Sequence, residues 1–325
     1  MSKIIFTLCV FLSKSAFAEE ISFPVPKAMA VLGDSMSEGM LADYSLEKKP
    51  GFADIVNLVW IGSENNETLR INAYRQSFAA KSKSWSGGND PKDLVVSHFE
   101  RLRELNHDLV EANFAVSGDE SKGLEAQVDQ FLQAERSEGI VFDYVTLMIG
   151  ANDLAQVAVE DLVSPQKYIS NVERALRRIL SANRDRRIFI VGLPNVHKIF
   201  EESKDFSVYK FWYDSLKCDS MRRQVYGPKL MFFPDREEDY RKTKEIVSEY
   251  REALGDLVEK LSMEFYSTSF KFLKEYRLPT NIKKALSIDC FHPSEWGQAE
   301  LAELTWAGSF WPNILPSEFG LWNQR

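Results

Sequence analysis

Short apolar runs alternate with longer amphipathic segments along almost the whole chain. The apolar runs have the length and the flanking turn residues of buried strands. They cover Ala28–Leu32, Glu111–Val116, Tyr144–Ile149, Ile188–Val191 and Glu264–Ser267. Helical spacing of apolar residues marks the segments around them, at Phe52–Ile61, Pro91–Leu105, Gly123–Glu135, Pro165–Asn183, Tyr240–Met263 and Ser294–Phe310. This alternation predicts an α/β fold with a five-stranded parallel sheet that helices cover on both faces.

The first 18 residues have the pattern of a secretory signal peptide. Lys3 precedes an apolar stretch, and Ala16-Phe17-Ala18 places small residues at the positions of a cleavage site. The apolar stretch is too short to span a bilayer, and no later segment is long and apolar enough to do so. We therefore expect cleavage after Ala18 and a secreted or periplasmic protein. Lys14 is atypical so close to the cleavage site, so a short uncleaved anchor is the alternative.

The net charge limits the classes of binding partner, and the length limits the number of domains. The 325 residues carry a formal charge of −8, and loss of Lys3 and Lys14 with the signal would lower it to −10. This balance argues against nucleic acid and against long-range attraction to anionic membranes. It does not exclude a lipid substrate, because single lipid molecules are bound through apolar contacts. No Pro/Gly/Ser-rich linker or repeat divides residues 19–325, so we predict a single domain there.

Two of the three cysteines lie outside the signal, at Cys218 and Cys290. An even number of cysteines in an exported chain favours one disulfide, which would tie a mid-chain segment to the late motif described below. Two free buried thiols are the alternative.

Four segments carry candidate chemistry, and three of them directly follow a predicted strand. The first is Gly33-Asp34-Ser35, where a strand ends in a turn that would display a hydroxyl at the ligand-binding edge of the sheet. The second ends in Gly118, whose backbone N–H could approach a ligand oxygen closely. The third, Gly150-Ala151-Asn152-Asp153, offers an amide donor for an oxyanion. Read alone, each is equally an ordinary turn or helix cap.

The fourth segment is a late loop, Asp289-Cys290-Phe291-His292-Pro293. Its Asp-x-x-His spacing lets a carboxylate reach one ring nitrogen while the other faces outward, as in the acid and base of a catalytic triad. A local loop hydrogen bond is the alternative. The four segments nevertheless supply, in order, a nucleophile, two oxyanion donors and an acid–base pair. His98, His107 and His197 lie outside these segments, and we expect surface or capping roles for them.

In order and spacing, these residues resemble the four signature blocks of the GDSL, or SGNH, hydrolase family. The resemblance extends from about Val31 to Pro312 and is greatest to phospholipase B-like members. The segments that resemble this branch are Ser84-Trp85-Ser86-Gly87-Gly88, Asn113-Phe114-Ala115-Val116, Ile149-Gly150-Ala151-Asn152-Asp153-Leu154 and Asp289-Cys290-Phe291-His292-Pro293-Ser294. Two departures are Met36 in place of the usual leucine and the sequence Ser-Gly-Asp around Gly118. Little resembles the family between Phe200 and Asn281, so an insertion around 200–281 would shape the substrate pocket.

The resemblance implies a three-layer α/β/α sandwich with the strand order of flavodoxin. It implies that Ser35 is the nucleophile, His292 the general base and Asp289 the residue that orients the imidazole. The oxyanion hole would consist of the backbone N–H groups of Ser35 and Gly118 and the side-chain amide of Asn152. It requires neither a metal nor a cofactor. The sequence also contains no Gly-x-Ser-x-Gly elbow and no His-Glu-x-x-His zinc motif.

These observations predict an exported serine ester hydrolase that acts on acyl esters, above all of phospholipids or lysophospholipids, through an acyl-enzyme. Transfer of the acyl group to another alcohol is possible in the same site. A carbohydrate or peptidoglycan O-acetyl esterase is the alternative within the enzyme class. A non-catalytic surface-binding protein on the same fold is the alternative from another class. The sequence does not specify the oligomeric state.

Overall fold

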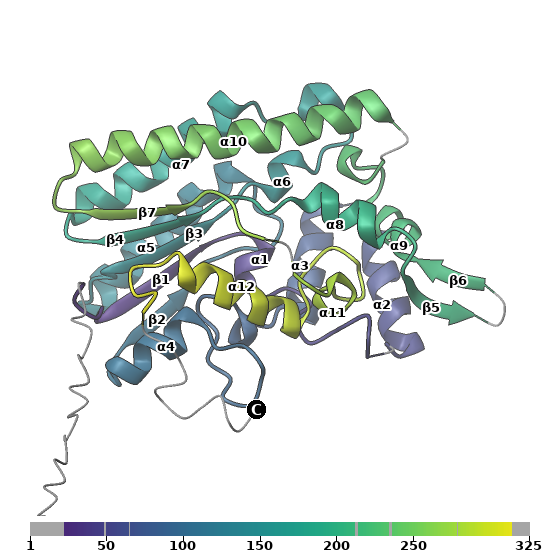
Figure 1. The fold of residues 1–325 in the computed structure, drawn as a ribbon, viewed down its shortest axis with the longest axis horizontal. Coiled ribbons are helices and arrows are strands. Elements are labelled where there is room, and N and C mark those ends of the chain that lie inside the picture. The colour runs from purple at the N-terminus through teal and green to yellow at the C-terminus, as the bar shows by residue number, and fades with distance from the viewer. Residues whose placement is uncertain are drawn as a thin grey trace, which may run out of the picture.

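Five parallel strands form the central sheet of the protein (Figure 1). The computed structural model describes residues 23–313 except 49, 65, 212–213, 234–235 and 278, so the predicted signal lies outside the described residues. The strands are β1 (Ala28–Gly33), β2 (Val110–Asn113), β3 (Tyr144–Met148), β4 (Arg187–Val191) and β7 (Ser269–Leu273). Their spatial order, β2-β1-β3-β4-β7, is the doubly wound order of flavodoxin. The predicted fold class is confirmed.

Helices surround this sheet, and a small antiparallel hairpin, β5 (Ser207–Phe211) and β6 (Asp214–Lys217), lies outside it. None of the described helices has the length and apolar composition needed to cross a membrane. The helices are α1 (Ser35–Glu38), α2 (Phe52–Gly62), α3 (Glu67–Phe78), α4 (His98–Leu105), α5 (Leu124–Glu138), α6 (Ala151–Leu154), α7 (Pro165–Ala182), α8 (Val196–Ser203), α9 (Cys218–Tyr226), α10 (Glu237–Glu264), α11 (Ile282–Ala285) and α12 (Glu295–Ala307).

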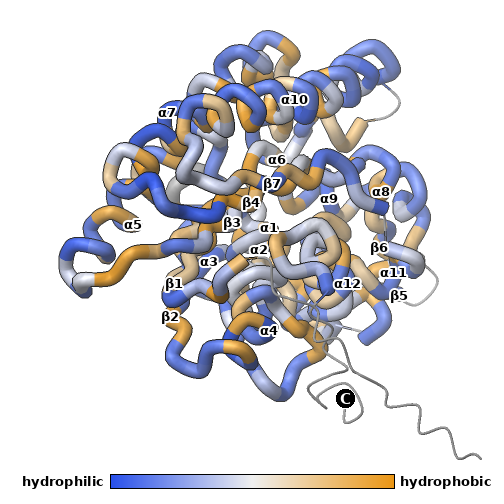
Figure 2. The backbone as a smooth tube through the Cα atoms, turned by 60° about the vertical axis from the view of Figure 1, so that its left-hand side comes forward, coloured by the Kyte–Doolittle hydropathy of each residue, from blue (hydrophilic) through white to orange (hydrophobic). Residues whose placement is uncertain are grey.

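Alternate residues of the strands enter two separate cores. Ala30 and Leu32 of β1 pack with the apolar faces of α5, α7 and α10. Met29 and Val31 point to the opposite face, where α4 and α12 cover the sheet. Strands buried on both faces are apolar along their whole length, and Figure 2 shows β3 and β4 as mostly hydrophobic. A third cluster joins α2, α3 and α9 to the loop that contains Cys290.

The fifth strand was predicted at Glu264–Ser267, and this position is wrong. Helix α10 continues to Glu264, Phe265 is buried as its C-cap, and the strand begins only at Ser269. The apolar residues that suggested a strand therefore end a helix and form a turn. Other boundaries also differ, among them the end of β2, at Asn113, and the start of α4, at His98 and not at Pro91. A capping box between Ser97 and Glu100 sets the start of α4.

Candidate active site

Ser35 lies at the carboxyl end of β1, where the strand turns sharply into α1. Gly33 makes this turn with φ +148°, and a Cβ there would lie 2.3 Å from the carbonyl oxygen of Met148. Only glycine fits this position. Asp34 caps α1 by accepting the Met36 N–H at 3.1 Å, and burial raises the pKa of this carboxyl to about 6. Ser35 follows as the first residue of the helix and is 4% exposed.

His292 and Asp289 reach Ser35 from the loop before α12. The Nε2 atom of His292 lies 2.7 Å from the Ser35 Oγ, and its Nδ1 atom lies 2.6 Å from Oδ2 of Asp289. Asp289 is completely buried, which by itself would raise the pKa of its carboxyl. The charge of His292 and hydrogen bonds from His292, Tyr226 and the Phe291 N–H outweigh burial and lower that pKa. The three predicted side chains thus form one hydrogen-bonded row.

The candidate oxyanion donors lie in the same pocket as Ser35 and His292. Gly118 has φ +84°, and a Cβ there would meet Ile71 at 2.8 Å. Among the described residues, neither the Ser35 N–H nor the Gly118 N–H has a hydrogen-bond partner, so both can bind an incoming oxygen. The Asn152 amide donates one N–H to the carbonyl oxygen of Asp119 at 2.9 Å, which leaves its second N–H for a ligand.

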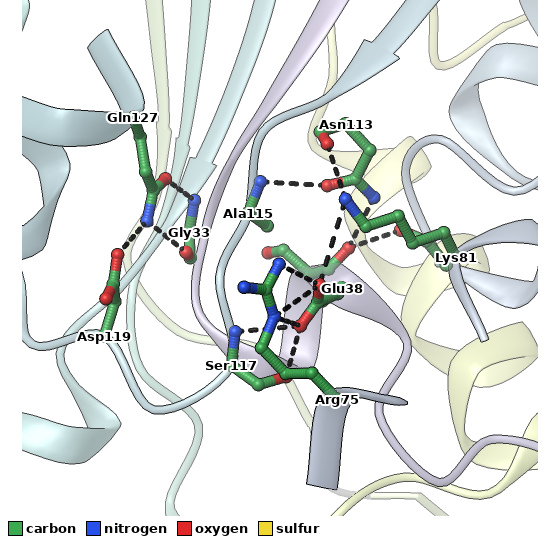
Figure 3. A network of polar contacts seen from close by, with 11 residues as sticks. Gly33, Glu38, Arg75, Lys81, Asn113, Ala115, Ser117, Asp119 and Gln127 are labelled. Carbon is green, nitrogen blue, oxygen red and sulfur yellow. Dashed lines mark hydrogen bonds and ion pairs between the residues drawn. The ribbon is translucent and has the colours of Figure 1, made fainter. Parts of the chain in front are cut away.

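Glu38 holds one side of the loop that carries Gly118 (Figure 3). Its Oε2 atom accepts the Ser117 N–H at 2.8 Å and the Ser117 hydroxyl at 2.5 Å. Oε1 accepts two hydrogen bonds from Arg75, at 3.1 Å and 2.9 Å. The Glu38 side chain is 1% exposed, and Lys81 lies 3.8 Å from Oε1. A buried carboxylate with these partners fixes the residue directly before Gly118.

Gln127 of α5 holds the other side of the same loop (Figure 3). Its amide pairs in both directions with the backbone of Gly33, at 2.9 Å and 2.8 Å. The same Nε2 atom donates to Oδ2 of Asp119 at 2.8 Å. One buried side chain therefore joins the turn before Ser35 to the residue after Gly118.

The predicted cysteine pair forms a disulfide, Cys218–Cys290. It connects the first residue of α9 to the residue after Asp289. Cys290 also has φ +61°, a left-handed conformation that a residue with a Cβ adopts only when its surroundings impose it.

Two histidines that we expected at the surface or at helix caps lie in the core. His98 and His197 are buried, so the predicted surface or capping roles are wrong for both. His98 lies between the hydroxyls of Tyr144 and Thr305, and burial lowers its pKa well below the ordinary value. His197 bonds to the Thr243 hydroxyl at 2.7 Å. Each is a neutral core residue with polar partners.

Sequence reasoning missed Glu38, Gln127 and Tyr226 as parts of the site. Each acts over a long separation: 79 residues from Glu38 to Ser117, 94 from Gln127 to Gly33 and 63 from Tyr226 to Asp289. Nothing in a local motif indicates such contacts. The one available signal was the position of Glu38, three residues after Ser35 on the same short helix.

The chain matches one protein-family model and resembles several solved structures. Residues 29–305 match the family model described as GDSL-like Lipase/Acylhydrolase. No curated protein matches the chain. Among solved structures, TesA is similar, with 13% identity, a TM-score of 0.44 and coverage of 89% of this chain and 99% of that chain.

Two further solved structures show weak similarity of the same kind. One is a mutant of Axe2, an acetyl-xylooligosaccharide esterase from Geobacillus Stearmophilus, with 16% identity, a TM-score of 0.43 and coverage of 86% and 92% of the two chains. The other is phospholipase A1 from Streptomyces albidoflavus NA297, with 12% identity, a TM-score of 0.35 and coverage of 90% and 99%. Similarities of this size do not indicate a substrate.

Proposed function

This chain belongs to the GDSL-like lipase/acylhydrolase family, and on that premise we propose that it is an exported serine ester hydrolase of phospholipids or lysophospholipids. The observation that carries the proposal is the unbroken row from Ser35 Oγ through both ring nitrogens of His292 to Asp289, with contacts of 2.7 Å and 2.6 Å. A nucleophile, a base and an orienting carboxylate in this arrangement are the parts needed for acyl transfer.

In the first half of the reaction, the Ser35 Oγ forms a bond to the ester carbonyl carbon while its proton passes to Nε2 of His292. The negative charge that develops on the carbonyl oxygen is stabilised by the N–H groups of Ser35 and Gly118 and by the Asn152 amide. Loss of one such donor typically lowers turnover by about 10²–10³. The bond to the alcohol then breaks, and the departing alcohol takes the proton from Nε2.

In the second half, water attacks the acyl-enzyme and gives a proton to Nε2, which returns it to Ser35 as the fatty acid leaves. Asp289 stays ionised throughout and stabilises the charged imidazole. The lowered pKa of its carboxyl supports this role. An alcohol in place of water would give acyl transfer by the same steps.

The lining of the pocket around Ser35 favours a lipid over an acetylated sugar. Ile71, Phe232 and Phe291 provide apolar walls for an acyl chain. Arg70 and Lys229 line the same pocket and would attract a phosphate group. A lysophospholipid carries both an acyl chain and a phosphate, whereas a neutral acetylated sugar would use neither feature. Phospholipase B-like activity would use both the apolar walls and the two cations of this pocket, which Glu120 also lines.

Export is consistent with the disulfide, since such bonds persist in oxidising compartments. The proposed signal at residues 1–18 would direct the protein there.

The test compares three substrates side by side: a lysophospholipid, a diacyl phospholipid and an acetylated sugar. The protein starts at Glu19, and Ser35→Ala serves as the blank. Fatty acid release that disappears in Ser35→Ala is the expected result. Release of acetate alone would transfer the function to carbohydrate deacetylation. Failure on all three substrates, together with failure of a fluorophosphonate to label Ser35, would overturn the enzyme proposal.

A further inference from the structure

Helix α9 lies against the loop that carries Asp289 and His292, near α8 and α11 (Figure 1). We infer that α9 holds this loop in place and that Tyr226, the last residue of α9, is a positioning residue for Asp289 and His292. The inference rests on the proposed ester hydrolysis, because it assigns a role within that reaction.

Three residues of α9 contact the loop, and they are spaced four apart. Residues at this spacing share one face of a helix. Cys218 forms the disulfide to Cys290. Arg222 donates from Nη1 to the Cys290 carbonyl oxygen at 3.1 Å, and Tyr226 donates its hydroxyl to Oδ2 of Asp289 at 2.5 Å. One face of α9 therefore contacts the loop from the first residue of the helix to the last.

Arg222 also anchors α9 on its other side. Its Nη1 donates to the Ser203 hydroxyl at 2.9 Å and its Nη2 to the Phe200 carbonyl oxygen at 3.2 Å, both on α8. The side chain is 1% exposed, so these bonds do not compete with water. The disulfide and Arg222 together hold Cys290 in its left-handed conformation. This conformation turns the chain between Asp289 and His292, so that the two side chains can meet.

Tyr226 and His292 converge on the same oxygen. Oδ2 of Asp289 accepts the tyrosine hydroxyl at 2.5 Å and the imidazole Nδ1 at 2.6 Å, while Oδ1 accepts the N–H groups of Phe291 and His292 at 3.1 Å each. These bonds fix the direction of the carboxylate. Burial and the charge of Asp289 raise the pKa of Tyr226 well above its ordinary value, so the tyrosine remains a donor.

Removal of the Tyr226 hydroxyl changes the charge balance of the pair in a defined direction. The Asp289 carboxylate loses a donor that stabilises its ionised form. Without the competing tyrosine hydroxyl, it also stabilises the charged imidazole more strongly. Both effects make the pair hold a proton at higher pH. Among the described residues, the ionisable groups Asp34, Arg70, Tyr74 and Arg222 also act on Asp289, His292 or Tyr226. The variant below leaves all four in place.

The experiment compares the wild type with Tyr226→Phe and with a control, Tyr144→Phe. The control also removes a buried hydroxyl contact, the 2.8 Å bond between Tyr144 and His98. Tyr144 is the first residue of β3, at the end of the strand away from the site. The first readout is the pH dependence of kcat/KM on a chromogenic ester between about pH 5 and pH 9. The second is the titration of the His292 ring proton by NMR, which needs no turnover.

For Tyr226→Phe we expect a fall in kcat of about tenfold, little change in KM and a shift of the acid limb to higher pH by about half a unit or more. The NMR titration should shift in the same direction, and Tyr144→Phe should shift neither. An acid limb and an NMR titration that coincide with the wild type would overturn the inference, as would an equal shift in Tyr144→Phe. Wild-type protein without turnover or phosphonate labelling would contradict the proposed function only, because the NMR arm would still decide the role of Tyr226.

Discussion

Ser117 donates both its backbone N–H and its hydroxyl to a single oxygen of Glu38, at 2.8 Å and 2.5 Å. Glu38 lies on the helix that begins with Ser35, and Ser117 immediately precedes Gly118. The contact therefore joins the candidate nucleophile to a candidate oxyanion donor through Ser117, which lines the pocket, and Glu38, which does not. We expect the relative position of Ser35 and Gly118 to depend on this buried carboxylate and on Arg75, which forms an ion pair with it.

The Glu38→Gln variant should keep the fold and have a lower kcat. The amide keeps one acceptor for Ser117 but turns an N–H₂ group toward Arg75, so the loop before Gly118 should loosen. We expect kcat to fall about tenfold, less than the loss from deleting an oxyanion donor outright. KM should change little, because Glu38 does not line the pocket. Steady-state kinetics on a chromogenic ester measure both constants.

Glu303→Gln is the matched control for Glu38→Gln. It removes the carboxylate partner of a buried arginine, Arg101, at 2.6 Å on α12, outside the pocket. The control should retain the wild-type kcat. A Glu38→Gln enzyme within about twofold of the wild type would show that Ser117 does not depend on Glu38.

The disulfide should contribute strongly to stability. Cys218 and Cys290 are 72 residues apart, and closing a loop of this length lowers the entropy of the unfolded chain by an amount worth about 4 kcal/mol. Urea unfolding with and without reductant, on protein that starts at Glu19, measures the difference. Cys218→Ser/Cys290→Ser is the control and should not respond to reductant. A reductant effect below about 1 kcal/mol in the wild type would contradict this role.

Three of the five strands, β1, β3 and β4, could be predicted because each is a largely apolar run followed by a turn, as Ala28–Gly33 shows. The prediction overlaps β2 only in part, because β2 is short and contains Glu111. The fifth could not be placed correctly, since β7 alternates Phe270 and Phe272 with polar residues, and the aromatic residues Phe265 and Tyr266 just before it belong to the end of α10 and a turn. A partly buried edge strand carries a weaker signal than a central one. The order β2-β1-β3-β4-β7 came from the family resemblance, not from the pattern.

The candidate site shows the same division. Asp289 and His292 are three residues apart, so their contact is visible as a motif. Glu38, Gln127 and Tyr226 act through pairs that only the fold brings together. Glutamate and glutamine are mostly found on surfaces, so nothing marks Glu38 and Gln127 as buried. His98 looked like a surface residue because nothing near it in the sequence reveals Tyr144 and Thr305, its partners in the core.

Glu111 should make stability fall as pH rises. Burial raises the pKa of its carboxyl from 4.5 to about 7, so the folded state binds a proton that the unfolded state releases. The stability that this proton provides is complete below about pH 4.5 and is lost as pH rises through about 7. Glu111→Gln lacks this loss. Its advantage over the wild type in unfolding free energy should therefore grow between about pH 5 and pH 8, by at most about 3 kcal/mol. Urea unfolding at the two pH values measures it, and a constant difference would contradict the argument.

Arg70 and Lys229 should select the head group of the substrate. Both line the pocket around Ser35, so replacing either with glutamine removes positive charge where a phosphate would bind. A partly exposed charge interaction is worth about 1 kcal/mol, so KM for a lysophospholipid should rise about fivefold in each variant. KM for a neutral ester such as p-nitrophenyl butyrate should not change, and added salt should reduce the lysophospholipid effect. Lys260→Gln is the control, since Lys260 pairs with Glu173 far from the pocket. An equal rise in KM for both substrates would mean that the two cations shape the pocket without binding the phosphate.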